Sequence, residues 1–243
     1  MEILLPVIGT SEQYGIAPSK IIAVGLNYRA HVAESESVKV QGFTEDVPPE
    51  PVLFNKTPNV LIGPGQCIPL PAAAEESFGK NARTDLEGEL VVLIGRRGKN
   101  IPESEALEYV RGYTCGNDVS QRNIQNADKS GWFRGKSFDG FGPVGPALLP
   151  AGGEVDPQNF NIQTRLNGKV VQNSNTGAMI FPVARLIAYI SRQFTLEEGD
   201  LIFTGTPAGV SPLAPGDVVE VEIEGIGVLK NTVSRESMDS RNI

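Results

Sequence analysis

Two glutamates separated by a single glycine stand at the start of an apolar run in TDLEGELVVLIG, residues 84–95. The run LVVLI is typical of a buried strand, and successive side chains of a strand point to opposite faces. Glu87 and Glu89 are therefore predicted to lie close together on one face, while Gly88 points to the other face and leaves room for close packing. Taken alone, the pair is interpreted as a solvated strand edge, because most acidic side chains are exposed.

A third carboxylate, Asp118 in CGNDVSQRNIQ (residues 115–125), favours a different interpretation. Asp118 is predicted to open a helix that places Arg122 and Gln125 on one face. Two glutamates and an aspartate that converge in a partly dry site repel one another unless a cation neutralises them. Because oxygen ligands favour hard divalent ions, the three carboxylates predict Mg²⁺ or Mn²⁺, with Ca²⁺ as an alternative, rather than zinc.

The chain has one histidine, His31, and Glu34 follows three positions later, within reach on a helical turn. A carboxylate beside an imidazole fixes its tautomer and raises its basicity, which a general base that deprotonates water requires. A lone histidine is also commonly a satisfied surface or core residue, so the pattern leaves both interpretations open. The next segment, residues 37–51, has no steady period and several prolines, which predicts a long loop of the kind that forms lids.

Two Gly-containing turns offer further polar groups. GWFRGKSFDGFGP resembles a phosphate-binding loop, but three residues rather than four separate Gly131 from Gly135 and no strand precedes them, which excludes a P-loop. Lys136 in this turn could hold a substrate carboxylate, although most lysines are solvated. FTGTPAGVSP, residues 203–212, follows a strand and carries Thr206, which indicates either an ordinary turn or a nest of backbone donors for an anion.

The elements that must position these groups are mostly strands. Strands are predicted at KIIAVGLN, VLFNK, NVLIG, GPVGPALLP, NFNIQTRLNGKVVQ with a hairpin at Asn167-Gly168, DLIFTG and DVVEVEIEGIGVLKNTV. Helices are predicted over residues 102–113 and, with clear amphipathic spacing, over 181–194, whereas the Pro- and Ala-rich stretch 64–83 is predicted to be a connection. Because strands dominate and do not alternate regularly with helices, the sequence predicts an α+β, predominantly β fold.

Composition narrows the class of function. The chain has 29 acidic and 21 basic residues, a net charge of −8 and no run of Lys and Arg, which argues against nucleic acid as a partner. No apolar stretch approaches the ~20 residues of a membrane span, and the first residues resemble no secretion signal, so we expect a cytoplasmic protein without membrane contact. Cys67 and Cys115 are expected to be reduced, buried thiols.

Six segments occur in the order GLNYRAHVAE, PVLFNK, DLEGELVVLIG, YTCGNDVSQRNIQ, GKSFDGFGPVGP and LEEGDLIFTGTPAGVSPLAPGD, and together they resemble the fumarylacetoacetate hydrolase family. The resemblance is to its small members, which include acylpyruvate and fumarylpyruvate hydrolases, oxaloacetate decarboxylases and the isomerase/decarboxylase of homoprotocatechuate degradation. It implies a mixed β-roll or β-sandwich that forms a homodimer. We therefore expect a short β extension over residues 1–19, a catalytic domain over 20–235 and a tail over 236–243.

The resemblance also implies a role for each candidate residue. The implied metal ligands are Glu87, Glu89 and Asp118, the implied catalytic groups are His31, Glu34 and Lys136, and the implied substrate-positioning residues are Arg122, Gln125 and Thr206. The ion would be Mg²⁺ or Mn²⁺, with Ca²⁺ possible. Larger eukaryotic members have a further aspartate upstream of the histidine; the segment VGLNY has no acid, so a water or the substrate would complete the metal shell here.

The expected activity is divalent-metal-dependent hydrolysis of a C–C bond in a small 2,4-dioxo acid of the acylpyruvate or fumarylpyruvate type. The same enolate chemistry without water gives decarboxylation or keto–enol isomerisation, as in the homoprotocatechuate-pathway enzymes or oxaloacetate decarboxylase, and this is the first alternative. A non-catalytic metal- or ligand-binding relative is a second alternative, against which the proton-transfer groups argue. In each enzymatic case the partner is a small 2-oxo acid.

Overall fold

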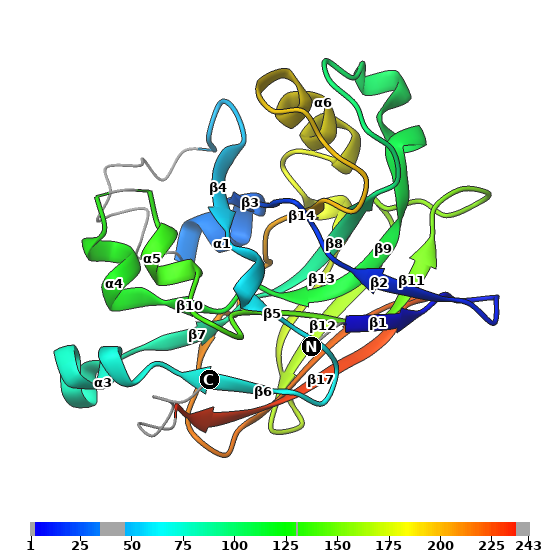
Figure 1. The fold of residues 1–243 in the computed structure, drawn as a ribbon. Helices are drawn as coiled ribbons and strands as arrows, with labels where there is room; N and C mark the ends of the chain where they lie inside the picture. The colour runs from blue at the N-terminus through cyan, green and yellow to red at the C-terminus, as the bar shows by residue number, and fades with distance from the viewer. Residues whose placement is uncertain (1–2, 35–46, 130, 237–243) are drawn as a thin grey trace.

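The computed structural model describes residues 3–34, 47–129 and 131–236, and Figure 1 shows their arrangement. Most of the loop predicted over residues 37–51 lies outside the described residues. Within them, two large curled sheets form the body of the molecule, and short helices lie around it (Figure 1). The predicted α+β, predominantly β fold is confirmed.

A seven-stranded sheet carries most of the candidate residues. Its strands, in spatial order, are β4 (Val52–Lys56), β3 (Ile21–Gly25), β14 (Leu201–Phe203), β8 (Gly88–Ile94), β9 (Val110–Asn117), β11 (Gly142–Pro150) and β5 (Leu61–Ile62). β8 lies in the middle and is antiparallel to β14 and β9, whereas β14 is parallel to β3. All 7 residues of β8 are buried because both faces of the sheet are covered, which explains its unbroken apolar run.

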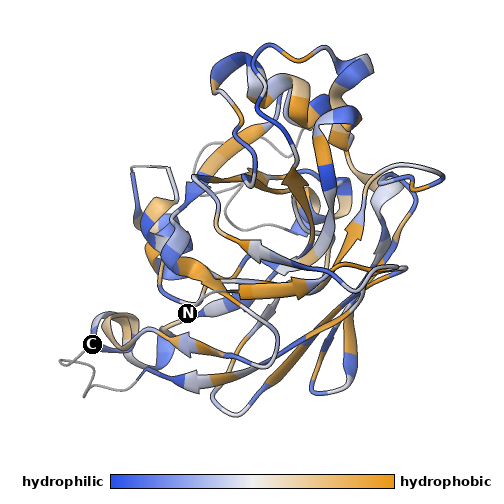
Figure 2. Cartoon of the chain, turned by 45° about the vertical axis from the view of Figure 1, so that its right-hand side comes forward, coloured by the Kyte–Doolittle hydropathy of each residue, from blue (hydrophilic) through white to orange (hydrophobic). Residues whose placement is uncertain are grey.

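A five-stranded sheet packs against the first one. Its strands, in spatial order, are β13 (Lys169–Asn175), β12 (Asn161–Leu166), β16 (Val218–Ile223), β17 (Gly227–Arg235) and β6 (Cys67–Leu70). β8 and β9 contact β12, β16 and β17, and apolar side chains of both sheets, such as Leu90, Ile162 and Val221, belong to one core. Figure 2 shows hydrophobic residues on the central strands and hydrophilic ones along the loops. The hairpin predicted at Asn167-Gly168 is confirmed, with positive φ at both residues.

Two smaller sheets complete the body. β7 (Thr84–Leu86) pairs with both β10 (Ser120–Gln121) and β15 (Ser211–Pro212), and β1 (Ile3–Pro6) pairs with β2 (Gln13–Ile16). The β1–β2 hairpin adds Ile3, Leu5 and Ile16 to the main core. The segment expected as an N-terminal extension therefore shares its apolar core with the strands that follow.

The helices are short. They are α1 (Arg29–Glu34), α3 (Ala72–Phe78), α4 (Arg122–Ala127), α5 (Phe133–Lys136) and α6 (Val183–Gln193), with 3-10 helices η1 (Pro58–Val60), η2 (Gly79–Asn81), η3 (Glu103–Tyr109) and η4 (Thr176–Ala178). The predicted amphipathic helix is α6, which buries Leu186, Ile187 and Ile190. The helix predicted over residues 102–113 is the 3-10 helix η3, after which the chain enters β9. In the part of the chain that the structure describes, no helix has the length and apolar character to cross a membrane.

Two further expectations differ from the structure, besides the helix predicted over 102–113, which is a 3-10 helix that ends at Tyr109. The stretch 64–83, predicted as a connection, contains β6 and α3; Pro69 is tolerated because β6 is an edge strand, and α3 begins with alanines, which are strong helix formers. Cys67, predicted to be buried, is exposed, because alternate side chains of β6 face solvent and Cys67 is on that side. Cys115 is buried as predicted, and both thiols are free.

Candidate active site and metal centre

The two glutamates lie where the chain passes from the three-stranded sheet into the seven-stranded sheet. Glu87 stands between β7 and β8, and Glu89 is the second residue of β8. Glu87 and Glu89 are only 4% and 2% exposed, so the interpretation of the pair as a solvated strand edge is wrong. Nε of the nearby Arg83 donates to Oδ1 of Asp85 at 2.9 Å.

Gly88 brings this strand into contact with the second sheet, as predicted. A Cβ at Gly88 would lie 2.1 Å from Oγ1 of Thr164. The N–H of Gly88 donates to Oε1 of Gln172 at 2.9 Å, and Nε2 of Gln172 donates to Oγ1 of Thr206 and to the carbonyl of Pro207, each at 2.8 Å. One buried amide thus ties the glutamate strand to the turn that follows β14.

Asp118 reaches the glutamates from the end of a strand. β9 ends at Asn117, and α4 begins only at Arg122, with the side chain of Gln121 as its N-cap. The prediction that Asp118 opens the helix is therefore wrong. The N–H of Asp118 donates instead to the carbonyl of Glu87 at 2.8 Å, and Oδ1 of Asn117 accepts the N–H of Glu87 at 2.8 Å. These two bonds fix the two carboxylate-bearing segments side by side.

The three carboxylates converge at one point. One oxygen from each of Glu87, Glu89 and Asp118 lies within 4.8 Å of the others, and all three residues are buried. Two oxygens bound to the same Mg²⁺, Mn²⁺ or Ca²⁺, each roughly 2.0–2.6 Å from the ion, are at most about 5 Å apart. The spacing and the all-oxygen chemistry of this group therefore fit a hard divalent cation.

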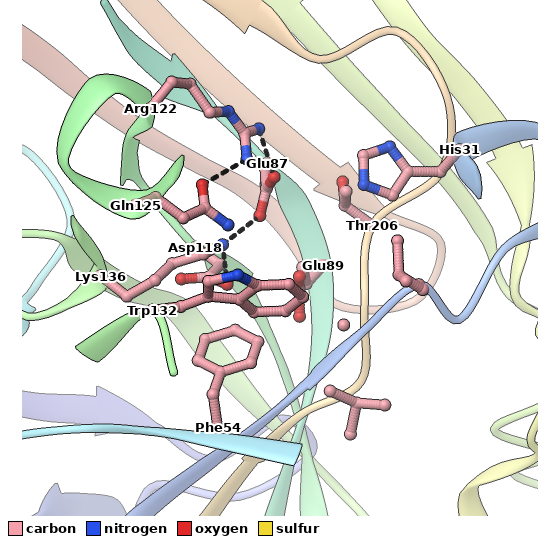
Figure 3. Close-up of a pocket in the computed structure, with 13 residues that line it drawn as sticks. His31, Phe54, Glu87, Glu89, Asp118, Arg122, Gln125, Trp132, Lys136 and Thr206 are labelled. Atoms are coloured by element: carbon pink, nitrogen blue, oxygen red, sulfur yellow. Dashed lines mark hydrogen bonds and ion pairs between the residues drawn. The ribbon is translucent and has the colours of Figure 1, made fainter. Parts of the chain in front are cut away.

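Buried cations hold two of the three carboxylates (Figure 3). Nζ of Lys136 donates to Oε2 of Glu87 at 2.6 Å and to Oδ2 of Asp118 at 2.7 Å. Arg122 donates to Oε1 of Glu87 at 2.5 Å, and Nζ of Lys56 donates to Oδ1 of Asp118 at 2.6 Å. Lys136, expected to meet a substrate oxygen, thus contacts the protein's own carboxylates in this structure.

Glu89 differs from the other two carboxylates in its electrostatic surroundings. Burial would raise the pKa of Glu87, but Arg122 and Lys136 outweigh burial and hold that pKa well below its usual range. Burial and the charges of Asp118 and Glu87 raise the pKa of Glu89 well above its usual range. Its Oε2 accepts the N–H of Gly205 at 2.8 Å. Glu89 is therefore the carboxylate whose negative charge is least compensated, and it stands where a cation would offset it.

His31 faces the carboxylates from the other side of the pocket (Figure 3). It lies on α1, is 6% exposed, and its Nδ1 is 3.2 Å from Oε1 of Glu34. The same carboxylate oxygen accepts the N–H of Gly209 at 2.8 Å. Burial would raise the pKa of Glu34, but the bonds to His31 and Gly209 outweigh it and lower that pKa, so Glu34 is ionised and orients the ring. The predicted His31–Glu34 contact is thus present.

The other candidate residues lie in the same pocket. Nη1 of Arg122 donates to Oε1 of Gln125 at 2.9 Å, so these two side chains share one face of α4 as predicted. The hydroxyl of Thr206 donates to the carbonyl of Gly88 at 2.9 Å and accepts from Gln172. In the turn after β14, where a nest of donors for an anion is one prediction, the N–H of Gly205 donates to the protein's own Glu89.

An apolar wall completes the pocket. Eight lining residues are polar or charged, namely His31, Glu87, Glu89, Asp118, Arg122, Gln125, Lys136 and Thr206, and the apolar side consists of Val24, Gly25, Leu26, Phe54 and Trp132. Phe54 comes from β4 and Trp132 immediately precedes α5. The pocket therefore offers charged and hydrogen-bonding groups on one side and aromatic and aliphatic surface on the other.

Sequence reasoning missed Lys56, which is the last residue of β4 and is 2% exposed. Its Nζ also donates to the carbonyl of Lys136 at 2.5 Å, which links the Asp118 carboxylate to the end of α5. Burial lowers the pKa of Lys56, and the Asp118 carboxylate opposes that shift. A lysine at the end of the strand VLFNK gave no local signal, because its partner lies 62 positions further along the chain.

We expect the Lys56→Met variant to lose about 3–5 kcal/mol of unfolding free energy, because it leaves the Asp118 carboxylate buried without this partner. Urea denaturation followed by circular dichroism measures the loss. The matched control is Lys230→Met, which removes an exposed ion pair with Glu220 and should change stability by less than about 1 kcal/mol. Equal stabilities of the two variants would show that the Lys56–Asp118 pair contributes nothing to folding.

The fold and this pocket define the class of protein. Residues 20–234 match the family described as Fumarylacetoacetate (FAA) hydrolase C-terminal, and the chain belongs to this family. It is 42% identical to the mitochondrial oxaloacetate tautomerase of Xenopus laevis over 225 residues, which cover 89% of this chain and 66% of that protein.

Solved structures of the family show the same fold. The crystal structure of 5-carboxymethyl-2-hydroxymuconate delta-isomerase from Mycobacterium smegmatis is 38% identical, with a TM-score of 0.79 over 94% of this chain and 87% of that one. The fumarylpyruvate hydrolase of Pseudomonas aeruginosa, solved with Mn²⁺ and pyruvate, is 31% identical, with a TM-score of 0.81 over 97% of each chain. Hydrolase, isomerase and tautomerase names thus all occur among proteins similar to this chain.

Proposed function

We propose that this chain is a divalent-metal-dependent enzyme that hydrolyses a C–C bond in a small 2,4-dioxo acid of the acylpyruvate or fumarylpyruvate type. The observation that carries the proposal is the presence of three convergent buried carboxylates and an oriented imidazole in one pocket. The carboxylates supply a site for an ion, and the imidazole supplies a base. The similar fumarylpyruvate hydrolase that was solved with Mn²⁺ and pyruvate supports the same reading.

Glu87, Glu89 and Asp118 would hold Mg²⁺ or Mn²⁺. When bound, the ion supplies a Lewis acid that stabilises the negative charge of an enolate. Lys136 and Lys56 keep the carboxylates in place by their bonds to Glu87 and Asp118. The two ring nitrogens of His31 would have different roles. If Nδ1–H donates to Glu34, then Nε2 carries the lone pair that accepts a proton from water.

The remaining polar groups orient the substrate. The guanidinium of Arg122 is fixed by Asp85 and Glu87, at 2.8 and 2.5 Å, and directs Gln125 through a further bond. An arginine held in this way presents its other N–H groups at a set angle, which suits an oxo acid. Lys136 is close enough to the carboxylates to steady a developing oxyanion beside them.

Proton transfer without hydrolysis of a C–C bond is the second candidate function. The relative with tautomerase in its name and the similar isomerase structure are 42% and 38% identical to this chain, whereas the similar hydrolase is 31% identical. On this reading His31 moves a proton between carbon and oxygen of a 2-oxo acid, and no water is consumed. Decarboxylation of the same class of substrate would use the same groups.

Product analysis separates these candidates. The protein is incubated with Mg²⁺ or Mn²⁺ and with acylpyruvates, fumarylpyruvate and oxaloacetate, while the enol absorbance is recorded and the products are identified by chromatography. Hydrolysis gives pyruvate and a second acid, tautomerisation changes the absorbance without new products, and decarboxylation releases carbon dioxide. We expect pyruvate from an acylpyruvate. Turnover of none of these acids would refute the proposed function.

A further inference from the structure

The chain contains one tryptophan, and it forms part of the pocket wall. Trp132 is 5% exposed and has a left-handed backbone, with φ of 72°, immediately before α5. Four positions later, the same short segment carries Lys136, which binds Glu87 and Asp118. The position of the indole is therefore coupled to the lysine that binds two of the three carboxylates.

The indole of Trp132 is seated on a glycine. A Cβ built at Gly25 would lie 2.6 Å from Cζ3 and 3.1 Å from Cη2 of Trp132, so the ring lies directly on the backbone of β3. The ring of Phe54 meets the indole edge to face, with centroids 5.4 Å apart. Nζ of Lys136 lies 4.9 Å from the centroid of the Phe54 ring. The indole thus packs against the backbone of Gly25 and against the ring of Phe54.

Figure 3 shows the indole in front of Asp118 and Glu89, next to Phe54 and across the pocket from His31. Trp132 lines the same pocket as the groups that would bind a 2-oxo acid, so a substituent that extends from the bound acid toward this wall would meet the indole. A flat, unbranched chain needs little space beside an aromatic ring, whereas a branched tetrahedral carbon is thicker and needs more clearance from it. A rigid wall discriminates between such substituents because a packed interior does not deform freely.

We infer that Trp132, which packs on Gly25, determines the specificity of this site and restricts it to 2-oxo acids whose substituent beyond the oxo carboxylate is unbranched. The inference rests on the function proposed above. Trp132 acts through shape, and it exchanges no proton with the substrate. Gly25 has its effect only through Trp132, because it is the absence of a Cβ that lets the indole occupy its position.

The first test compares acetylpyruvate with pivaloylpyruvate, which carries a branched acyl group. We expect Trp132→Ala to raise the ratio of kcat/KM for pivaloylpyruvate over acetylpyruvate at least about tenfold, which is the scale on which a pocket discriminates single methyl groups. Trp132→Leu, a less disruptive change, should raise the ratio by an intermediate factor, and Trp132→Phe should leave it near the wild-type value. An unchanged ratio in both Trp132→Ala and Trp132→Leu would overturn the inference.

The second test needs no turnover. Calorimetry with Mn²⁺-loaded protein measures the binding of oxamate and of N-tert-butyloxamate, two uncleavable analogues of a 2-oxo acid. The wild type should bind oxamate at least about tenfold more tightly, and Trp132→Ala should bind both alike. If the wild type turns over none of the 2-oxo acids, the proposed function fails, but this binding comparison still decides whether the wall selects by shape. Equal binding of both analogues by the wild type would refute selection.

The Gly25→Ala variant tests the contact between Gly25 and the indole of Trp132. Its Cβ must displace the indole, so we expect oxamate binding to weaken in the wild-type background and to be unaffected in the Trp132→Ala background. Gly63→Ala is the matched control, because a Cβ there meets its nearest atoms at 3.5 Å and fits. A loss of the same size in both backgrounds would contradict the coupling between Gly25 and Trp132.

Discussion

Replacing Glu89 with glutamine should lower the affinity for Mn²⁺ by about 100-fold or more, since even partners that only support a metal ligand are worth 10- to 100-fold. Glu89 is the proposed ligand with the least compensated charge, because Arg122 and Lys136 neutralise Glu87 and the two lysines neutralise Asp118. Removing its charge therefore removes most of the attraction for a cation. Turnover of 2-oxo acids should fall with metal occupancy.

The same variant should behave differently in the absence of metal. Glu89→Gln keeps the shape of the side chain and removes a carboxyl whose ionisation is opposed by burial and by the charges of Asp118 and Glu87 in the metal-free protein. The metal-free variant should therefore be at least as stable as the metal-free wild type. Calorimetric titration with Mn²⁺ after treatment with EDTA, and thermal melts with and without metal, measure both effects. Glu108→Gln is the control, since Glu108 is an exposed partner of Arg96. An unchanged Mn²⁺ titration in Glu89→Gln would remove the carboxylates from the metal site.

His31→Ala should reduce kcat for hydrolysis by about 100- to 10,000-fold, the range for losing a general base, and leave Mn²⁺ and oxamate binding close to wild type. The selective effect is expected because His31 stands across the pocket from the carboxylates and bonds to Glu34. Steady-state kinetics and calorimetry on the same protein sample measure the two quantities. Hydrolysis at the wild-type rate would exclude His31 as the base.

Substitution of Glu34 provides a second test of the proposed deprotonation of water by His31. Because Glu34 acts on water only through the imidazole, Glu34→Gln should lower kcat in the wild-type background and have no further effect in the His31→Ala background. Its second bond, to the N–H of Gly209, is made in both backgrounds, so any change in the position of that turn appears in both. Additive losses would mean that the Glu34 carboxylate contributes to the reaction independently of His31.

The acid-bearing strand and the hairpin could be predicted from sequence because their signals are local. The run LVVLI requires burial on both faces, and β8 has it; Asn167-Gly168 supplies the positive φ values that a tight turn needs. The stretch 64–83, predicted to be a connection, forms a strand and a helix because prolines disfavour a central strand but an edge strand such as β6 tolerates one of them.

The site could be predicted only in part, because many of its contacts join segments that are distant in sequence. The carboxylates and the imidazole are recognised by residue type and spacing, whereas their electrostatic surroundings depend on contacts between distant segments. Asp118 follows the end of β9 and does not start a helix. The sequence did not predict this strand, because its segment YTCGN is rich in small residues and carries little strand signal. Lys56 and the seat of Trp132 on Gly25 arise only when β3, β4 and α5 come together.

The amide of Gln172 has a consequence for redesigning this enzyme. It sits on β13 in the second sheet, yet it binds the N–H of Gly88 and the hydroxyl of Thr206. The segment that carries Glu87 and Glu89 is therefore hydrogen-bonded to the second sheet, and a substitution of Gln172 would disturb both sheets. Phe54 and Trp132 lie outside β8 and β13, although the segment of Trp132 also carries Lys136. Directed evolution toward new substrates should therefore mutate Phe54 and Trp132 and leave Gln172 and Lys136 unchanged.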